Sequence, residues 1–212
     1  MKLLLPAARI ERWVTNFESR HGTTQLSVSG GLVGAGEDGS TFKLSRSFDR
    51  PYEADPDISA FLSSLEPLED WGVLLVRKGG FAAARLEADR IVSHKVGKRH
   101  VQGRTKAGGQ SQQRFARRRD NQARAANLAA AEYARQILGS TPWIVTGGDR
   151  QAVTQVRSEI KLPAQVDSRW LECANPNRFV LDQAIQDAMC AEVIVSNADE
   201  VTSADTQGGA VR

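Results

Sequence analysis

The chain has 212 residues, of which 41% are hydrophobic and 25% are charged, a composition typical of a globular protein. We expect one sizeable domain, alone or with a small companion. The apolar run at the N-terminus is too short for a signal peptide, and no apolar span reaches 18 residues, which argues against secretion and membrane insertion. Cys173 and Cys190 form no CxxC motif, so we expect no disulfide framework and a reducing, cytoplasmic setting.

The net charge of +3 hides an uneven distribution. Residues 95–124 contain ten Lys and Arg residues against one acid, Asp120. The whole chain has 28 basic and 25 acidic residues, so 18 basic and 24 acidic residues lie elsewhere. A mildly acidic body with one cationic segment is typical of a protein that docks on nucleic acid.

Residues 1–66 predict a small α/β subdomain. Helical periodicity over residues 9–20 predicts an amphipathic helix, and short strands are expected near residues 26–28 and 42–44. The inward side of that helix is predicted to carry Ile10, Trp13, Val14 and Phe17. The Glu66-Pro67 dipeptide marks a break in regular structure.

Residues 67–198 predict a second domain with alternating strands and helices. Apolar runs predict a three-stranded meander, and a glycine- and lysine-rich loop over 97–110 follows it. Ser111 is the predicted N-cap of a helix that reaches Leu138 and stops at Gly139. The order beyond it is strand, helix, strand and a closing helix over 179–193. This order predicts an α/β fold with a mixed β-sheet covered by helices, and we expect the small, polar residues 199–212 to form a disordered tail.

The residues with the strongest functional signal are 103–119, which read GRTKAGGQSQQRFARRR. Gly108 and Gly109 give the backbone freedom to bring Gln110 into a confined site, so these three residues are the catalytic candidates. Cationic side chains around them can neutralise phosphates. The predicted RNA-binding residues are Lys98, Arg99, Arg104, Lys106, Ser111, Arg114, Arg117, Arg118 and Arg119.

Gly108-Gly109-Gln110-Ser111 followed by Arg-Phe-Ala-Arg at 114–117 resembles the GGQ loop and following helix of eukaryotic and archaeal class-one release factors. The short chain and the run RRRDNQ at 117–122 resemble the Vms-like peptidyl-tRNA hydrolases of the VLRF family. The resemblance covers about residues 68–198. It implies the ribonuclease-H-like core of the release-factor middle domain.

The resemblance also implies an activity in ribosome rescue and quality control. The GGQ loop would enter the peptidyl-transferase centre of the large ribosomal subunit and admit water to the ester of peptidyl-tRNA. The Gln110 backbone N–H would stabilise developing negative charge, and its side chain would orient water. The implied partners are peptidyl-tRNA, ribosomal RNA and the large subunit, and we expect a monomer.

Two features predict release that does not depend on a codon. About 65 residues precede the predicted catalytic domain, too few for the stop-codon-reading domain of the release factors. Nothing after residue 198 resembles the domain that recruits a release GTPase. We therefore expect action on split large subunits that carry obstructed peptidyl-tRNA.

Two other functions stay open at this point: an endonuclease that cleaves the 3′ end of peptidyl-tRNA, and a non-catalytic RNA-binding or ribosome-associated module. No cofactor is expected, because the GxGxxG pattern at 34–39 lacks a strand-turn-helix context and contains two acids. No metal site is expected either, since His21, His94 and His100 lack the spacing of metal ligands.

Overall fold

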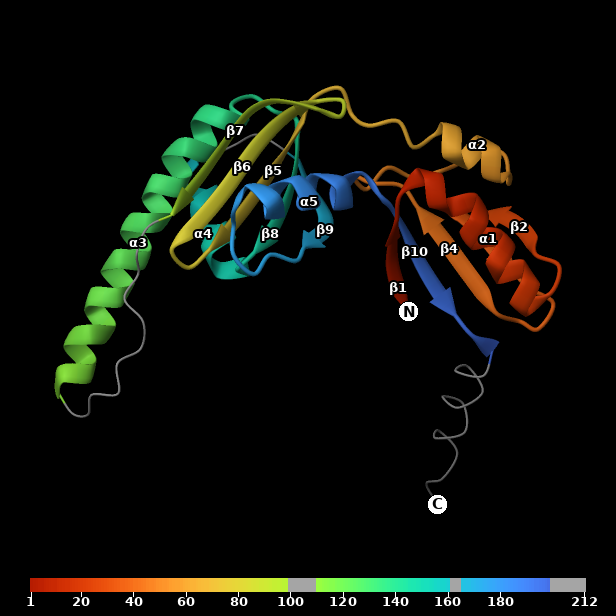
Figure 1. The fold of residues 1–212 in the computed structure, drawn as a ribbon, viewed down its shortest axis with the longest axis horizontal. Helices are drawn as coiled ribbons and strands as arrows, with labels where there is room; N and C mark the ends of the chain where they lie inside the picture. The colour runs from red at the N-terminus through yellow and green to blue at the C-terminus, as the bar shows by residue number, and fades with distance from the viewer. Residues whose placement is uncertain (99–109, 161–164, 199–212) are drawn as a thin grey trace, which may run out of the picture. The chain divides into compact units, whose positions relative to one another are not determined.

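The computed structural model describes residues 1–98, 110–160 and 165–198, and they form two compact units. The first unit comprises residues 1–66 and the segment from Met189 onward, and the second comprises residues 67–188. The described residues contain two five-stranded sheets and five helices, which confirms the predicted mixed α/β class (Figure 1). The predicted tail, 199–212, lies outside the described residues.

The first unit is an antiparallel sheet with the strand order β1-β10-β4-β3-β2, packed against helix α1. The predicted helix over 9–20 is confirmed, with Ile10, Val14 and Phe17 buried and Trp13 partly buried. Phe17 meets Phe42 edge to face, with ring centroids 4.9 Å apart. The elements are β1 (Lys2–Leu5), α1 (Ala7–His21), β2 (Gln25–Val28), β3 (Leu32–Ala35), β4 (Thr41–Ser45), α2 (Ile58–Ser63) and β10 (Ala191–Ser196).

Strand β10 corrects two predictions. The closing helix was expected over 179–193 and the second domain was expected to end at residue 198, but the helix ends at Met189 and β10 joins the first sheet between β1 and β4. Val193 pairs with Leu3 on one side and Leu44 on the other. Alternate residues of β10 are buried, which is the period of a strand with one face on a core. The chain therefore returns to its first unit.

The second unit is a mixed sheet with the strand order β7-β6-β5-β8-β9. Strands β5, β6 and β7 form the predicted antiparallel meander, while β8 runs parallel to β5 and β9 runs parallel to β8. The elements are β5 (Trp71–Arg77), β6 (Gly80–Glu87), β7 (Arg90–Lys98), α3 (Gln110–Leu138), β8 (Trp143–Gly148), α4 (Arg150–Ile160), β9 (Gln165–Leu171) and α5 (Arg178–Met189).

Helices cover both faces of this sheet. Helices α3 and α4 share a core with Leu74 and Val76 of β5 and with Phe81 and Ala83 of β6. The intervening residues of both strands are also buried, and α5 lies over that other face (Figure 1). Strand β5 is therefore a continuous apolar run, as strands covered on both faces are. This double cover holds the base of α3 in place.

Candidate nucleic-acid interface

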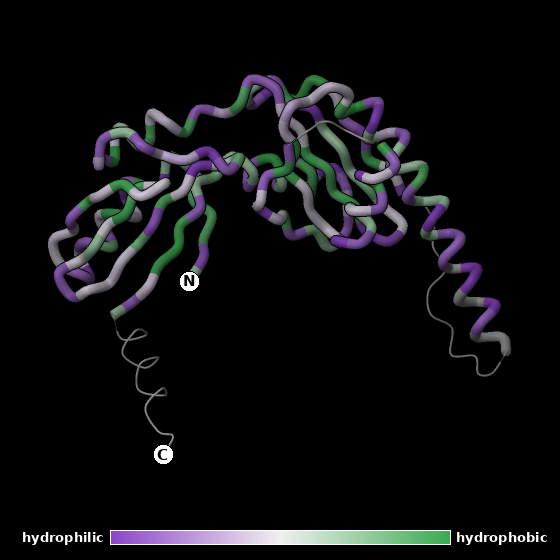
Figure 2. Tube along the Cα trace, turned by 180° about the vertical axis from the view of Figure 1, so that it is seen from behind, coloured by the Kyte–Doolittle hydropathy of each residue, from purple (hydrophilic) through white to green (hydrophobic). Residues whose placement is uncertain are grey.

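Helix α3 has two parts with different surroundings, which we call the stem (126–138) and the arm (110–125). The stem packs on the sheet, and the arm extends beyond the end of the sheet (Figure 1). At about 1.5 Å per residue the arm is roughly 24 Å long. Figure 2 shows the same division in hydropathy, since the arm is mostly hydrophilic and the strands beneath the stem are mostly hydrophobic.

Small side chains fix the stem. Ala126, Ala130, Ala134 and Leu138 are buried at helical spacing against the sheet and α4. Alanine has the highest helix propensity and lets a helix approach its neighbours closely, so this sequence suits a helix pressed against a core. The helix ends where predicted, because Gly139 adopts φ +45° and its N–H bonds to the carbonyl of Arg135 at 3.0 Å.

One side of the stem carries an aromatic pair at the edge of the core. Tyr133 has the helical spacing of the buried stem residues, but 39% of it is exposed. Its ring stacks on Phe81 of β6, with centroids 5.6 Å apart, and Lys95 Nζ lies 4.9 Å from the Tyr133 ring centroid. An exposed aromatic ring beside a lysine therefore borders the helix.

The arm is a cationic surface. The described arginine side chains on it, at positions 114, 117, 118 and 124, are all exposed. Among the side chains that the structure describes, none forms an ion pair with Asp120, the acid that follows the three arginines. Its carboxylate instead lines a hollow at the base of the arm. The arm can meet several phosphates at once, because these four described arginine side chains have no acidic partners among the described residues.

The catalytic candidates fall at the boundary of what the structure describes. Gln110 is the first residue of α3, at the tip of the arm, while Gly108 and Gly109 lie outside the described residues. Ser111 was the predicted N-cap, but the helix already includes Gln110, so Ser111 belongs to the first turn. Gln110 therefore begins a helix whose stem is anchored 16 residues further along the chain.

The remaining predicted RNA-binding residues divide between the arm and its surroundings. Arg119 lies within α3, and Lys98 is exposed at the end of β7. Arg99, Arg104 and Lys106 lie outside the described residues. The structure thus brings the predicted arginines of residues 114–119 together on one helix.

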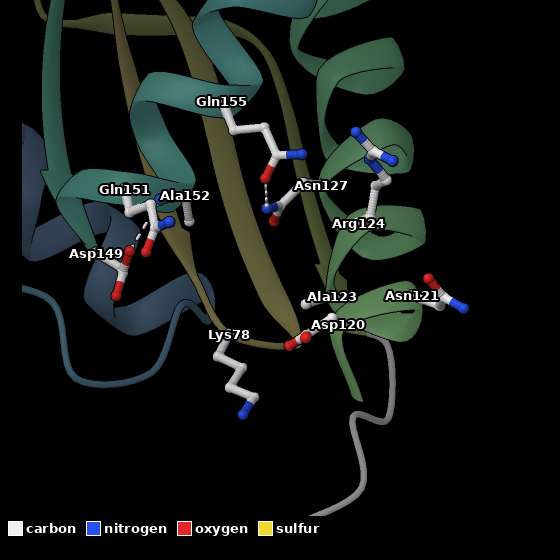
Figure 3. Close-up of a pocket in the computed structure, with 11 residues that line it drawn as sticks. Lys78, Asp120, Asn121, Ala123, Arg124, Asn127, Asp149, Gln151, Ala152 and Gln155 are labelled. Carbon is white, nitrogen blue, oxygen red and sulfur yellow. Dashed lines mark hydrogen bonds between the residues drawn. The ribbon is translucent and has the colours of Figure 1, made fainter. Parts of the chain in front are cut away.

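A polar hollow of about 420 Å³ lies at the base of the arm (Figure 3). Lys78 of the β5–β6 turn, Asp120 and Arg124 of α3 and Asp149 before α4 line it. The sequence did not predict this site, because Lys78 precedes Asp120 by about 40 positions and Asp149 follows Asp120 by about 30. The one local indication of a polar site is Asn127, a polar residue in the otherwise alanine-rich buried face of the stem.

The structure also bears on metal and membrane binding. Within the described ranges, no group of three or more His, Cys, Asp and Glu side chains is arranged to hold a metal ion. None of the described helices is long and apolar enough to cross a bilayer. Cys173 and Cys190 are buried free thiols.

Comparisons with solved structures find weak similarity to other proteins, including these two. An archaeal translation termination factor, aRF1, aligns with a TM-score of 0.42 and 13% identity over 83% of this chain and 52% of that one. The chain thus spans about half the length of aRF1. The Vms1 mitochondrial localization core aligns with a TM-score of 0.42 and 11% identity over 90% of this chain and 84% of that one.

Comparison with protein families gives the assignment. No curated protein matches the chain in sequence. The sequence model of the family described as "Actinobacteria/chloroflexi VLRF1 release factor" matches residues 69–194, more than half of the chain and nearly all of the second unit. The chain therefore belongs to the actinobacterial and chloroflexi VLRF1 release-factor family.

Proposed function

We propose that the protein is a codon-independent peptidyl-tRNA hydrolase that frees nascent chains from stalled large ribosomal subunits in the cytoplasm. The observation that carries the proposal is the position of Gln110, the last residue of a Gly-Gly-Gln sequence and the first of a cationic helix that extends beyond its sheet. Family membership supports a role in peptide release. Its partners would be peptidyl-tRNA and ribosomal RNA.

The arm gives the proposal its geometry. A rigid helix roughly 24 Å long can carry Gln110 into a passage too narrow for the body of the second unit. Exposed arginines along the same helix can contact the phosphates that line such a passage. The stem anchors the helix in a core, so that the position of its tip follows from where the body docks.

The chemistry is hydrolysis of an ester. Water adds to the carbonyl carbon that joins the nascent chain to the tRNA, the bond to the 3′ oxygen breaks, and the products are a peptide carboxylic acid and a tRNA with a free 3′ hydroxyl. The Gln110 backbone N–H would donate to the oxygen on which negative charge develops, and its side-chain amide would orient the water. Removing one such donor typically slows a reaction by about 100- to 1000-fold.

The glycines have a separate task. A backbone that passes close to RNA needs residues without a Cβ. Gly108 and Gly109 supply such residues directly before Gln110. Substituting either with alanine should lower the rate of release and leave the affinity for RNA unchanged, because no cationic group is lost.

Single-turnover release tests this function. Purified large subunits carrying labelled peptidyl-tRNA are mixed with the wild-type protein, and both the freed peptide and the size of the tRNA are measured. The proposal predicts free peptide with full-length tRNA, and equal activity with or without a stop codon on whole ribosomes. A shortened tRNA would identify an endonuclease, and binding without any product would identify a non-catalytic RNA-binding module.

A further inference from the structure

The hollow beside the arm sits where open α/β sheets commonly bind ligands. It lies at the carboxyl ends of the parallel strands β5 and β8, next to the turn at Lys78 and Gly79 and the first turn of α4 (Figure 3). Its volume, about 420 Å³, is within the range of small-molecule sites. Ligands of such folds bind in the crevice outside the carboxyl ends of the strands.

A pair of amides, one buried and one half-buried, forms one wall of the hollow. Asn127 of the stem is only 9% exposed, and its Nδ2 donates to Oε1 of Gln155 in α4 at 2.8 Å. Among the described residues no hydrogen bond reaches Asn127 Oδ1 or Gln155 Nε2. The pair therefore offers an acceptor and a donor that are held in place by their mutual bond. Base edges carry neighbouring donors and acceptors, and Asn and Gln amides are common partners of such groups.

The charges around the hollow cancel. Lys78 and Arg124 oppose Asp120 and Asp149, and Asp149 Oδ1 already accepts the N–H of Ala152 at 2.8 Å. All four of these side chains are exposed, and two carboxylates beside two cations leave no net charge to attract a free phosphate, whereas a neutral base needs none. The exposed Lys78 and Arg124 can contact phosphates that flank such a base. The electrostatics thus suit a neutral ring within a nucleic-acid strand.

A second hollow continues this surface along the stem. Its volume is about 310 Å³, and it shares Gly79 and Asn127 with the first. Lys95, Lys98 and the exposed Tyr133 ring line it. Lysines interleaved with an aromatic ring are typical of surfaces that bind single-stranded nucleic acid.

We propose that the first hollow binds one unpaired RNA nucleotide, with its base against Asn127 and Gln155 and its flanking phosphates on Lys78 and Arg124. The inference deepens the proposed function by adding a base-reading contact at the root of the arm. The inference rests on the proposed function in one respect: that function is the reason why we assign the nucleotide to an RNA strand and not to a free nucleotide.

Fluorescence anisotropy with four labelled RNA hexamers, each of a single base, tests the site without ribosomes. The wild-type protein should prefer one base. Asn127→Leu should weaken binding of that hexamer at least about fivefold and remove the preference, because the amide that distinguishes bases is lost. Lys78→Glu should weaken the binding of all four hexamers by the same factor. The matched control is Gln136→Leu, an exposed amide on α3 outside both hollows, and it should change nothing.

Two results would overturn the assignment. One is that the wild type and Asn127→Leu bind each of the four hexamers with the same affinity. The other is displacement of the hexamers by AMP, CMP, GMP or UMP at equal concentration, since that would identify a free nucleotide as the ligand. If Asn127→Leu does not fold, as judged by its thermal melt, Gln155→Leu tests the same wall from the half-buried partner. Peptide release is measured separately, so the hydrolase proposal and the base-reading site can fail independently.

Discussion

The direction of the arm should control peptide release, and Ala125→Pro tests this. Ala125 is exposed at the junction of arm and stem, one residue before the first buried residue among the α3 side chains that the structure describes. Proline there removes the N–H that bonds to the carbonyl of Asn121 and clashes with that carbonyl. Proline kinks in helices exceed about 20°. Over an arm of roughly 24 Å, that angle moves Gln110 by about 8 Å.

A displacement of about 1 Å can cost roughly 100-fold in rate, so Ala125→Pro should lose at least that factor in single-turnover release. Its core should stay folded, because every buried residue of the stem follows position 125. Ala125→Gly is the matched control, since it costs about 1 kcal/mol of helix propensity without removing a hydrogen bond. A native circular dichroism spectrum together with release within about tenfold of the wild type would refute the argument.

Three further predictions concern stability and reactivity. Leu138→Ala should lower the free energy of unfolding of the second unit by about 2–5 kcal/mol, because Leu138 is fully buried at the end of the stem, and a denaturant titration that shows less than 1 kcal/mol would contradict this packing. Burial raises the pKa of the Cys173 thiol, so a thiol reagent at neutral pH should label Cys173 slowly in the native protein and fast in denaturant; fast native labelling would show an accessible thiol. The hydrogen bond from His21 lowers the pKa of Asp38 below its ordinary value of 3.8, so the carboxylate stabilises the first unit above that value. The stability difference between wild type and Asp38→Asn should therefore be present at pH 6 and shrink as the pH falls below about 3.8, and a difference constant over that range would assign it to another cause.

The elements that the sequence predicted well have strong local patterns. Helix α1 has apolar residues at helical spacing, and β5 is an unbroken apolar run bounded by turn residues. Strand β10 was missed because it directly follows a helix, separated from it only by Cys190, so the two apolar patterns merge. Nothing local shows that this strand pairs with residues near position 44, because that pairing depends on the return of the chain.

In the candidate site, too, local patterns could be predicted and contacts between distant segments could not. The arm and its arginines could be predicted because they are contiguous in sequence. The amide pair could not, since Asn127 and Gln155 are 28 positions apart and meet only when α4 packs beside α3. Tyr133 fits the apolar stripe of the helix, yet it stacks at the edge of the core, where a phenol ring keeps its hydroxyl in water.

The central claim is that Gln110 performs peptide release, and the most direct measurement compares Gln110→Ala with Gln113→Ala in single-turnover release from large subunits carrying peptidyl-tRNA. Gln113 is an exposed glutamine one turn further along the arm, so both variants lose the same amide from the same helix. The account predicts a loss of about 100-fold for Gln110→Ala, because the side-chain amide that orients the water is lost while the backbone N–H stays, with less than tenfold for Gln113→Ala and unchanged binding for both. Equal release by the two variants would contradict it.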